Sequence, residues 1–80
     1  MNTIRQYDTV ALLEKVSATH FETQAPLILC PGQMGAVLDI YADGACEVEF
    51  CDMQGCTYAM LPLQPAQLMV LHTAPVDIAA

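Results

Sequence analysis

The stretch CPGQMGAVLDIYADGACEVEFCD, residues 30–52, decides the fold of this 80-residue chain. Its first half, GAVLDIY over residues 35–41, reads as a strand, and Ala42-Asp43-Gly44 follows it. Asp-Gly is a dipeptide typical of tight hairpin turns. We therefore predict an antiparallel hairpin whose second strand runs over residues 45–51.

The second strand of this hairpin alternates regularly between apolar and mostly polar residues. One side carries Cys46, Val48 and Phe50, and the other carries Glu47, Glu49 and Cys51. Successive side chains of a strand point to opposite faces of the sheet. The alternation therefore indicates a sheet with one buried face and one face in water.

The chain after this hairpin continues as strands and turns. A turn over residues 52–55 leads to a strand over residues 56–63, which places Thr57, Ala59, Leu61 and Leu63 on one face. The sequence LQPAQ predicts a single 3₁₀ turn over residues 63–67. A last short strand is expected over residues 68–71, and the tail is expected to be loosely ordered from about residue 73.

The chain before the hairpin is harder to interpret. Residues 7–13 suit a first strand, although a helix over residues 10–16 is an alternative. Residues 17–31 show no clean period, so we expect a long loop there, with a short strand at Leu27–Cys30 as the alternative. Gly32 and Gly35 precede a strand and lack a following Lys, so they serve backbone geometry and form no phosphate-binding loop.

Together these elements predict an all-β fold. About five short strands, a long early loop and a 3₁₀ turn before the last strand suit a small SH3-like antiparallel barrel. At 80 residues the chain is long enough for one domain, which we expect to span residues 1–80.

The charge of the chain restricts its partners. Lys and Arg total 2, Asp and Glu total 9, and the formal net charge is −7. Binding of nucleic acid or of an anionic membrane needs several cations, so we expect neither, and a basic protein is the natural complement. No signal peptide or apolar membrane span stands out, so we expect a cytoplasmic protein.

The apolar content of 55% is high for so small a domain. Exposed apolar side chains would serve self-association, most simply as a homodimer, or the binding of another protein. Small alanines spread over the surface are the alternative explanation. Met and Tyr adapt well to interfaces. The candidate interface residues are Met34, Tyr41, Glu47, Glu49, Met53, Tyr58 and Met60, with Met69 as a further methionine.

Two of these residues, Tyr58 and Met60, fall on the face opposite Ala59 and Leu61. They should therefore lie outside the barrel core. The alternative is that the long early loop covers them.

The reactive side chains form no recognisable catalytic, cofactor or metal motif. Cys46, Cys51 and Cys56 lack the close pairing of zinc ligands, although a Cys51–Cys56 disulfide remains an alternative to free thiols. His20 and His72 have no adjacent nucleophile. Asp39, Asp43, Glu47, Glu49 and Asp52 gather around one hairpin, as an acidic face or, alternatively, as a cation site. We expect no catalytic residue, cofactor or metal.

The order of these motifs resembles a family of small bacterial proteins catalogued as domain of unknown function 4926. The similar segments are YDTVALL (7–13), LCPGQMGAVLDIY (29–41), CEVEF (46–50) and LPLQPAQL (61–68). The resemblance implies an SH3-like barrel and no established activity. The pattern GxxGxVxxI also looks like the barrels of the nitrile hydratase β-subunit, a partner-binding type, and of ribosomal KOW modules, an RNA-binding type.

We therefore expect a non-enzymatic protein-interaction module. The alternatives are an acidic, antitoxin-like or inhibitory partner of a basic protein, a carrier of metal or a small ligand, and a KOW-like RNA-binding module, which the charge argues against.

Overall fold

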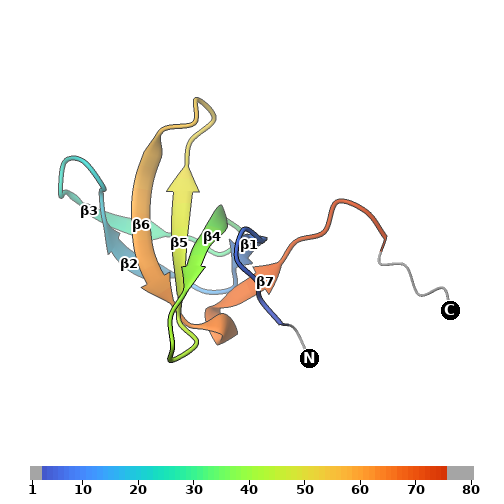
Figure 1. The fold of residues 1–80 in the computed structure, drawn as a ribbon. Helices are drawn as coiled ribbons and strands as arrows, with labels where there is room; N and C mark the ends of the chain where they lie inside the picture. The colour runs from blue at the N-terminus through green and yellow to red at the C-terminus, as the bar shows by residue number, and fades with distance from the viewer. Residues whose placement is uncertain (1–2, 76–80) are drawn as a thin grey trace, which may run out of the picture.

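The computed structural model describes residues 3–75 and consists of strands, turns and one short 3₁₀ helix (Figure 1). The elements are β1 (Thr9–Leu12), β2 (Val16–Thr19), β3 (Pro26–Leu29), β4 (Met34–Ile40), β5 (Cys46–Cys51), β6 (Thr57–Leu63), η1 (Pro65–Gln67) and β7 (Leu68–Val70). The all-β class and the 3₁₀ turn before the last strand are confirmed. The helix considered for residues 10–16 is not formed. No helix among residues 3–75 is long and apolar enough to cross a membrane.

The strands form two antiparallel sheets. Five of them make one sheet in the order β6-β5-β4-β1-β7, and β2 and β3 form a separate two-stranded sheet. The five expected strands are therefore confirmed as the larger sheet, and two more strands come from the early segment, where a long loop was expected. Within residues 3–75, strand pairing does not close the large sheet into a barrel, since β6 and β7 remain its edges.

The long loop expected over residues 17–31 is wrong, because this segment forms most of the β2–β3 hairpin. The alternative of a short strand at Leu27–Cys30 is confirmed by β3. The N–H of His20 donates to Ala25 O at 2.8 Å, and its Nδ1 accepts from the N–H of Glu22 at 3.1 Å and of Thr23 at 3.3 Å. A histidine ring thus caps a turn that lacks Asn-Gly or Asp-Gly. The hairpin lies behind the large sheet in Figure 1, and the N–H of Phe21 donates to Tyr58 O at 2.8 Å.

The two predicted tight turns of the main sheet are present. In the β4–β5 turn, Gly44 adopts a φ of +92°, and Asp43 Oδ1 accepts the N–H of Ala45 at 3.0 Å. In the β5–β6 turn, Asp52 Oδ1 accepts the N–H of Cys56 at 3.0 Å. Short acidic side chains thus stabilise both turns through backbone hydrogen bonds.

The core lies between the large sheet and the β2–β3 hairpin. Its buried cluster comprises Val10, Leu12, Leu29, Val37, Cys46, Val48, Phe50, Ala59, Leu63 and Leu68. The predicted inward face of β5 is confirmed, because Cys46, Val48 and Phe50 are each at most 1% exposed. A Cβ at Gly35 would lie 2.7 Å from Val48 Cγ1 and 2.9 Å from the carbonyl oxygen of Glu49. Only glycine therefore lets β4 lie so close to β5.

The loosely ordered tail expected from about residue 73 falls largely on residues 76–80, which lie outside the described residues. The described segment after β7 runs away from the large sheet (Figure 1). It begins with a hydrogen bond of 2.9 Å from the N–H of Leu71 to Thr9 O.

Candidate interaction surface

The side of the large sheet that faces away from the core, here called the outer face, has a continuous row of side chains across four strands. Thr9 of β1 pairs with Ala36 of β4, Ala36 with Glu49 of β5, and Glu49 with Met60 of β6. Residues directly opposite each other in neighbouring strands point to the same face. The row thus brings together residues from both ends of the chain.

A second row adds two exposed methionines to the outer face. Ala11 of β1 lies between Met34 of β4 and Met69 of β7 in the strand register. Met34 is 59% exposed and Met69 is 45% exposed, whereas Ala11 between them is buried. The outer face thus presents flexible apolar side chains around small ones.

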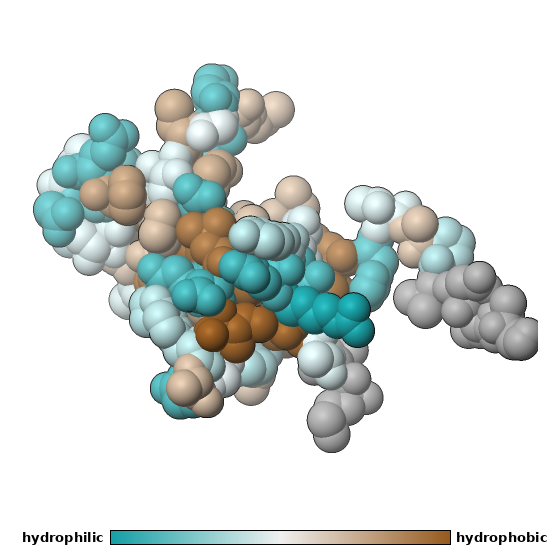
Figure 2. All heavy atoms as spheres, viewed as in Figure 1, coloured by the Kyte–Doolittle hydropathy of each residue, from teal (hydrophilic) through white to brown (hydrophobic). Residues whose placement is uncertain are grey.

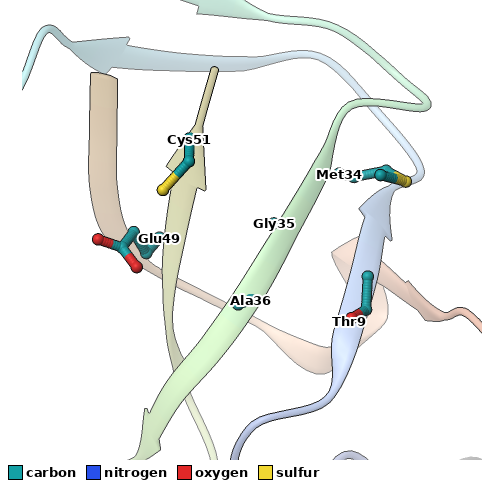
Figure 3. Close-up of a pocket in the computed structure, with 6 residues that line it drawn as sticks. All are labelled: Thr9, Met34, Gly35, Ala36, Glu49 and Cys51. Carbon is teal, nitrogen blue, oxygen red and sulfur yellow. The ribbon is translucent and has the colours of Figure 1, made fainter. Parts of the chain in front are cut away.

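A shallow open hollow of about 210 Å³ lies on this face (Figure 3). Its lining consists of Thr9, Met34, Gly35, Ala36, Glu49 and Cys51. Thr9, Gly35 and Ala36 form the floor: Ala36 has a small side chain, and Gly35 contributes only its backbone, because a side chain there would point into the core. Glu49 and Cys51 project from β5 at one side, and Met34 stands at the opposite side (Figure 3).

A second hollow of about 600 Å³ adjoins the first and is lined by Thr9, Met34, Leu71, His72, Thr73 and Ala74. The two hollows share Thr9 and Met34. They form one shallow groove, here called the outer-face groove, that extends from β5 across β4 and β1 to the segment after β7. In the space-filling view, hydrophobic spheres gather over the middle of the molecule and hydrophilic spheres lie beside them (Figure 2).

Hydrogen bonds hold the acidic side of the groove in place. The Thr57 hydroxyl donates to Glu49 Oε2 at 2.5 Å, and Cys51 Sγ lies 3.7 Å from the same hydroxyl. Thr57 therefore shares the outer face with Glu49. The prediction that Thr57 lies on the same face as Ala59 is wrong, because a register shift between Phe50 and Cys51 inserts Tyr58 as an extra residue in β6.

The same bulge turns Tyr58 away from the outer face. Its side chain packs against the core, with its ring 6.2 Å from that of Phe50, and its hydroxyl accepts from Gln33 Nε2 at 2.9 Å. The expectation that Tyr58 lies outside the core is therefore wrong. The β2–β3 hairpin covers Tyr58, so the alternative prediction is confirmed for this residue, whereas Met60 lies on the outer face opposite Glu49.

A second acidic residue of β5, Glu47, lies on the outer face two residues before Glu49. The Tyr41 hydroxyl donates to Glu47 Oε1 at 3.0 Å. This hydrogen bond is the main reason why the pKa of Tyr41 lies above its usual value of 10.0. Desolvation and the negative charges of Glu47 and Asp39 raise the pKa further by smaller amounts. Tyr41 is 44% exposed, so the pair is accessible at the end of β4.

The structure thus brings together part of the predicted interface. Met34, Glu47, Glu49 and Met60 share the outer face, and Tyr41 lies beside Glu47. Met53, which is 99% exposed, lies apart in the β5–β6 turn. The interface prediction did not include Thr9, Ala36 or Cys51, although the alternation in residues 46–51 indicated which face Cys51 occupies.

The cysteines are four free thiols. Cys51 pairs with Thr57 in the strand register, so the considered Cys51–Cys56 disulfide is not formed. Cys46 is 1% exposed, and its burial raises the pKa of its thiol. In the part of the chain that the structure describes, no group of three or more His, Cys, Asp or Glu side chains could hold a metal ion.

Comparison with known proteins gives one match. A family model described as a domain of unknown function, DUF4926, matches residues 6–70, which include every strand of both sheets. The chain belongs to the DUF4926 family. No curated protein and no solved structure matches this DUF4926 domain.

Proposed function

We propose that this DUF4926 domain is a non-enzymatic protein-interaction module whose contact surface is the outer face of the large sheet. The observation that carries the proposal is the outer face, where Met34 and Met69 stand exposed on either side of Ala11 and Met34 borders the outer-face groove. Methionine adapts its shape to irregular partners. Exposed apolar surface of this kind is a common mark of protein–protein contact.

We further propose that the fold belongs to the SH3-like class. Support comes from the antiparallel sheet in which β1 pairs with both β4 and β7, and from η1 directly before β7. The β2–β3 hairpin would then cover the open side of the sheet. In such a fold the outer face of the sheet is free for a partner.

The acidic side chains of β5 support a binding role rather than a catalytic one. Thr57 and Tyr41 each donate a hydrogen bond to a carboxylate, Glu49 and Glu47 respectively. The groove is shallow, and the carboxylate of Glu49 lies at its border, where it can meet a partner.

Solution mass is the first test of the module. Size-exclusion chromatography with light scattering is run at micromolar concentration on the wild type, Met34→Glu and Met53→Glu. A dimer or larger assembly that only Met34→Glu dissociates would support self-association through the outer face. Met53→Glu is the matched control, because it adds the same charge at an exposed methionine that lines neither hollow of the groove.

If all three proteins are monomers, each is immobilised and exposed to a lysate of the host. A protein retained by the wild type and by Met53→Glu, but lost on Met34→Glu, would support the module and identify its partner. The proposal fails if every variant is monomeric and retains the same proteins, or if all three retain none.

A further inference from the structure

We propose that the outer-face groove binds an extended, cationic and apolar segment of another protein. A Lys or Arg of the segment would pair with Glu49, and an apolar side chain of the segment would fill the hollow between Met34 and Ala36. This inference rests on the proposed function and adds to it the chemistry and conformation of the partner.

The apolar part of the proposal follows from the size and lining of the hollow. Sites for small organic ligands usually measure about 300–1,000 Å³. The hollow beside Glu49 is open and, at about 210 Å³, lies below this range, so it suits one side chain, and the adjoining hollow of about 600 Å³ leaves room for the next residues of the segment. Its floor of Thr9, Gly35 and Ala36 offers little polar recognition. The mobile thioether of Met34 can close over a side chain that enters.

The cationic part follows from charge complementarity. Glu49 Oε2 accepts a hydrogen bond from the Thr57 hydroxyl, and the carboxylate of Glu49 borders the hollow. Among residues 3–75, no Lys or Arg lines either hollow of the groove. Arg5 and Lys15 are the only basic side chains other than histidine in a chain of formal net charge −7. A cation at Glu49 must therefore come from a partner, and the net charge of the domain would attract it.

The extended conformation follows from the direction of the groove. From Glu49 through Ala36 and Thr9 to the end of β7, the groove crosses three gaps between neighbouring strands. At about 4.8 Å for each gap, this is roughly 14 Å. An extended peptide covers that distance with about four residues at roughly 3.4 Å each. Cationic and apolar side chains in alternation would then meet Glu49 and the hollow.

The test uses fluorescein-labelled Gly-Lys-Leu-Lys-Leu-Lys-Leu-Gly as the probe, with fluorescence anisotropy as the measurement. The full-length domain is titrated at low salt. Two comparison peptides replace every Lys by Glu or every Leu by Ser. We expect binding of the first peptide to be tightest and to weaken as salt is raised, because exposed ion pairs are screened.

Variants of the domain then locate the contact. Glu49→Gln, which keeps an acceptor for Thr57, should weaken binding about two- to fivefold, as expected for one exposed ion pair. Met34→Ala should weaken it about tenfold through lost apolar contact. Glu22→Gln, in the β2–β3 turn, and Met53→Ala are matched controls, and both should bind like the wild type.

Methyl NMR of labelled methionines gives an independent readout. The peptide should shift the resonances of Met34, Met60 and Met69 and leave that of Met53 unchanged. The inference is overturned if the acidic or Ser-containing peptide binds as well as the first. It is also overturned if Glu49→Gln and Met34→Ala both bind like the wild type, or if no peptide binds.

These outcomes are distinguishable from failure of the proposed function. If the domain self-associates through Met34 and does not bind the peptide, the proposal of a cationic segment is wrong, and the proposal of an interaction module is retained. If neither self-association, lysate capture nor peptide binding depends on Met34, both proposals fail.

Discussion

The Thr57 hydroxyl donates a hydrogen bond of 2.5 Å to Glu49 Oε2 across the β5–β6 ladder. The bond exists because the bulge at Tyr58 places Thr57 on the outer face, where Glu49 already lies. A charged acceptor makes such a bond stronger than one between neutral groups. It fixes the carboxylate at the border of the groove and joins the two strands through their side chains.

Removing the Thr57 hydroxyl should therefore destabilise the domain. We expect Thr57→Val to lower the free energy of unfolding by about 0.5–1.5 kcal/mol, the usual net contribution of one hydrogen bond. Thr57→Ser, which keeps the hydroxyl, should lose less. Urea denaturation followed by circular dichroism measures both variants. No loss in Thr57→Val, which keeps the methyl group, would show that the hydroxyl is not the cause.

The close approach of β4 to β5 predicts a larger effect at Gly35. In Gly35→Ala the new Cβ would lie 2.7 Å from Val48 Cγ1 and 2.9 Å from the carbonyl oxygen of Glu49. The carbonyl belongs to the backbone of β5 and cannot turn aside. We expect Gly35→Ala to lower the free energy of unfolding by about 1–3 kcal/mol, as other overpacked cores do.

A double-mutant cycle with Val48→Ala tests the cause of that loss. Val48→Ala removes Cγ1 and relieves one of the two clashes, so the double variant should lose less stability than the sum of the single losses. A coupling of about 0.5 kcal/mol or more is expected for residues in direct contact. Strictly additive losses in urea denaturation would argue that the clash with Val48 is not the cause.

The sequence was sufficient for the features that depend on local patterns. The β4–β5 hairpin follows from Asp43-Gly44, and the inward face of β5 follows from the alternation of apolar and polar residues. Glu49 was assigned to the outer face by the same alternation, and Met34 and Met60 were named as interface candidates because methionine adapts to interfaces. Each of these features requires only a few neighbouring residues in the chain.

Features set by contacts between distant segments could not be predicted in this way. Residues 57–63 read as an uninterrupted strand, and the bulge at Tyr58 becomes visible only when β6 is paired with β5. The β2–β3 turn has no typical turn dipeptide. Instead, the imidazole of His20 accepts hydrogen bonds from the N–H groups of Glu22 and Thr23. The floor of the groove depends on the pairing of Thr9 with Ala36, which lie on strands far apart in the sequence.

The burial of Cys46 predicts unequal reactivity of the four thiols. Cys46 is 1% exposed and burial raises the pKa of its thiol, whereas Cys30, Cys51 and Cys56 are exposed. Since the thiolate is the reactive form, Cys46 should react slowly with Ellman's reagent in the folded domain. We expect three thiols to react quickly and all four to react in denaturant. Four fast thiols in the folded protein would contradict the burial.

The hydrogen bond between Tyr41 and Glu47 predicts a pH dependence above neutrality. It raises the pKa of Tyr41, so the folded domain holds the phenolic proton more tightly than the unfolded chain does. The stability that this bond contributes is complete below pH about 10, the usual pKa of tyrosine. It is lost as the pH rises through the higher pKa of the folded state, because the phenolate repels Glu47 and can no longer donate.

Replacing the acceptor tests this directly. Glu47→Gln removes the negative charge and the charged acceptor, so the pKa of Tyr41 should fall toward its usual value. The titration is followed by NMR of labelled tyrosine rings, with Tyr41→Phe to assign the signal. Glu22→Gln removes a charge in the β2–β3 turn and serves as the control, which should leave the titration of Tyr41 unchanged. An unchanged titration in Glu47→Gln, or an equal fall in Glu22→Gln, would show that Glu47 is not the cause of the shift.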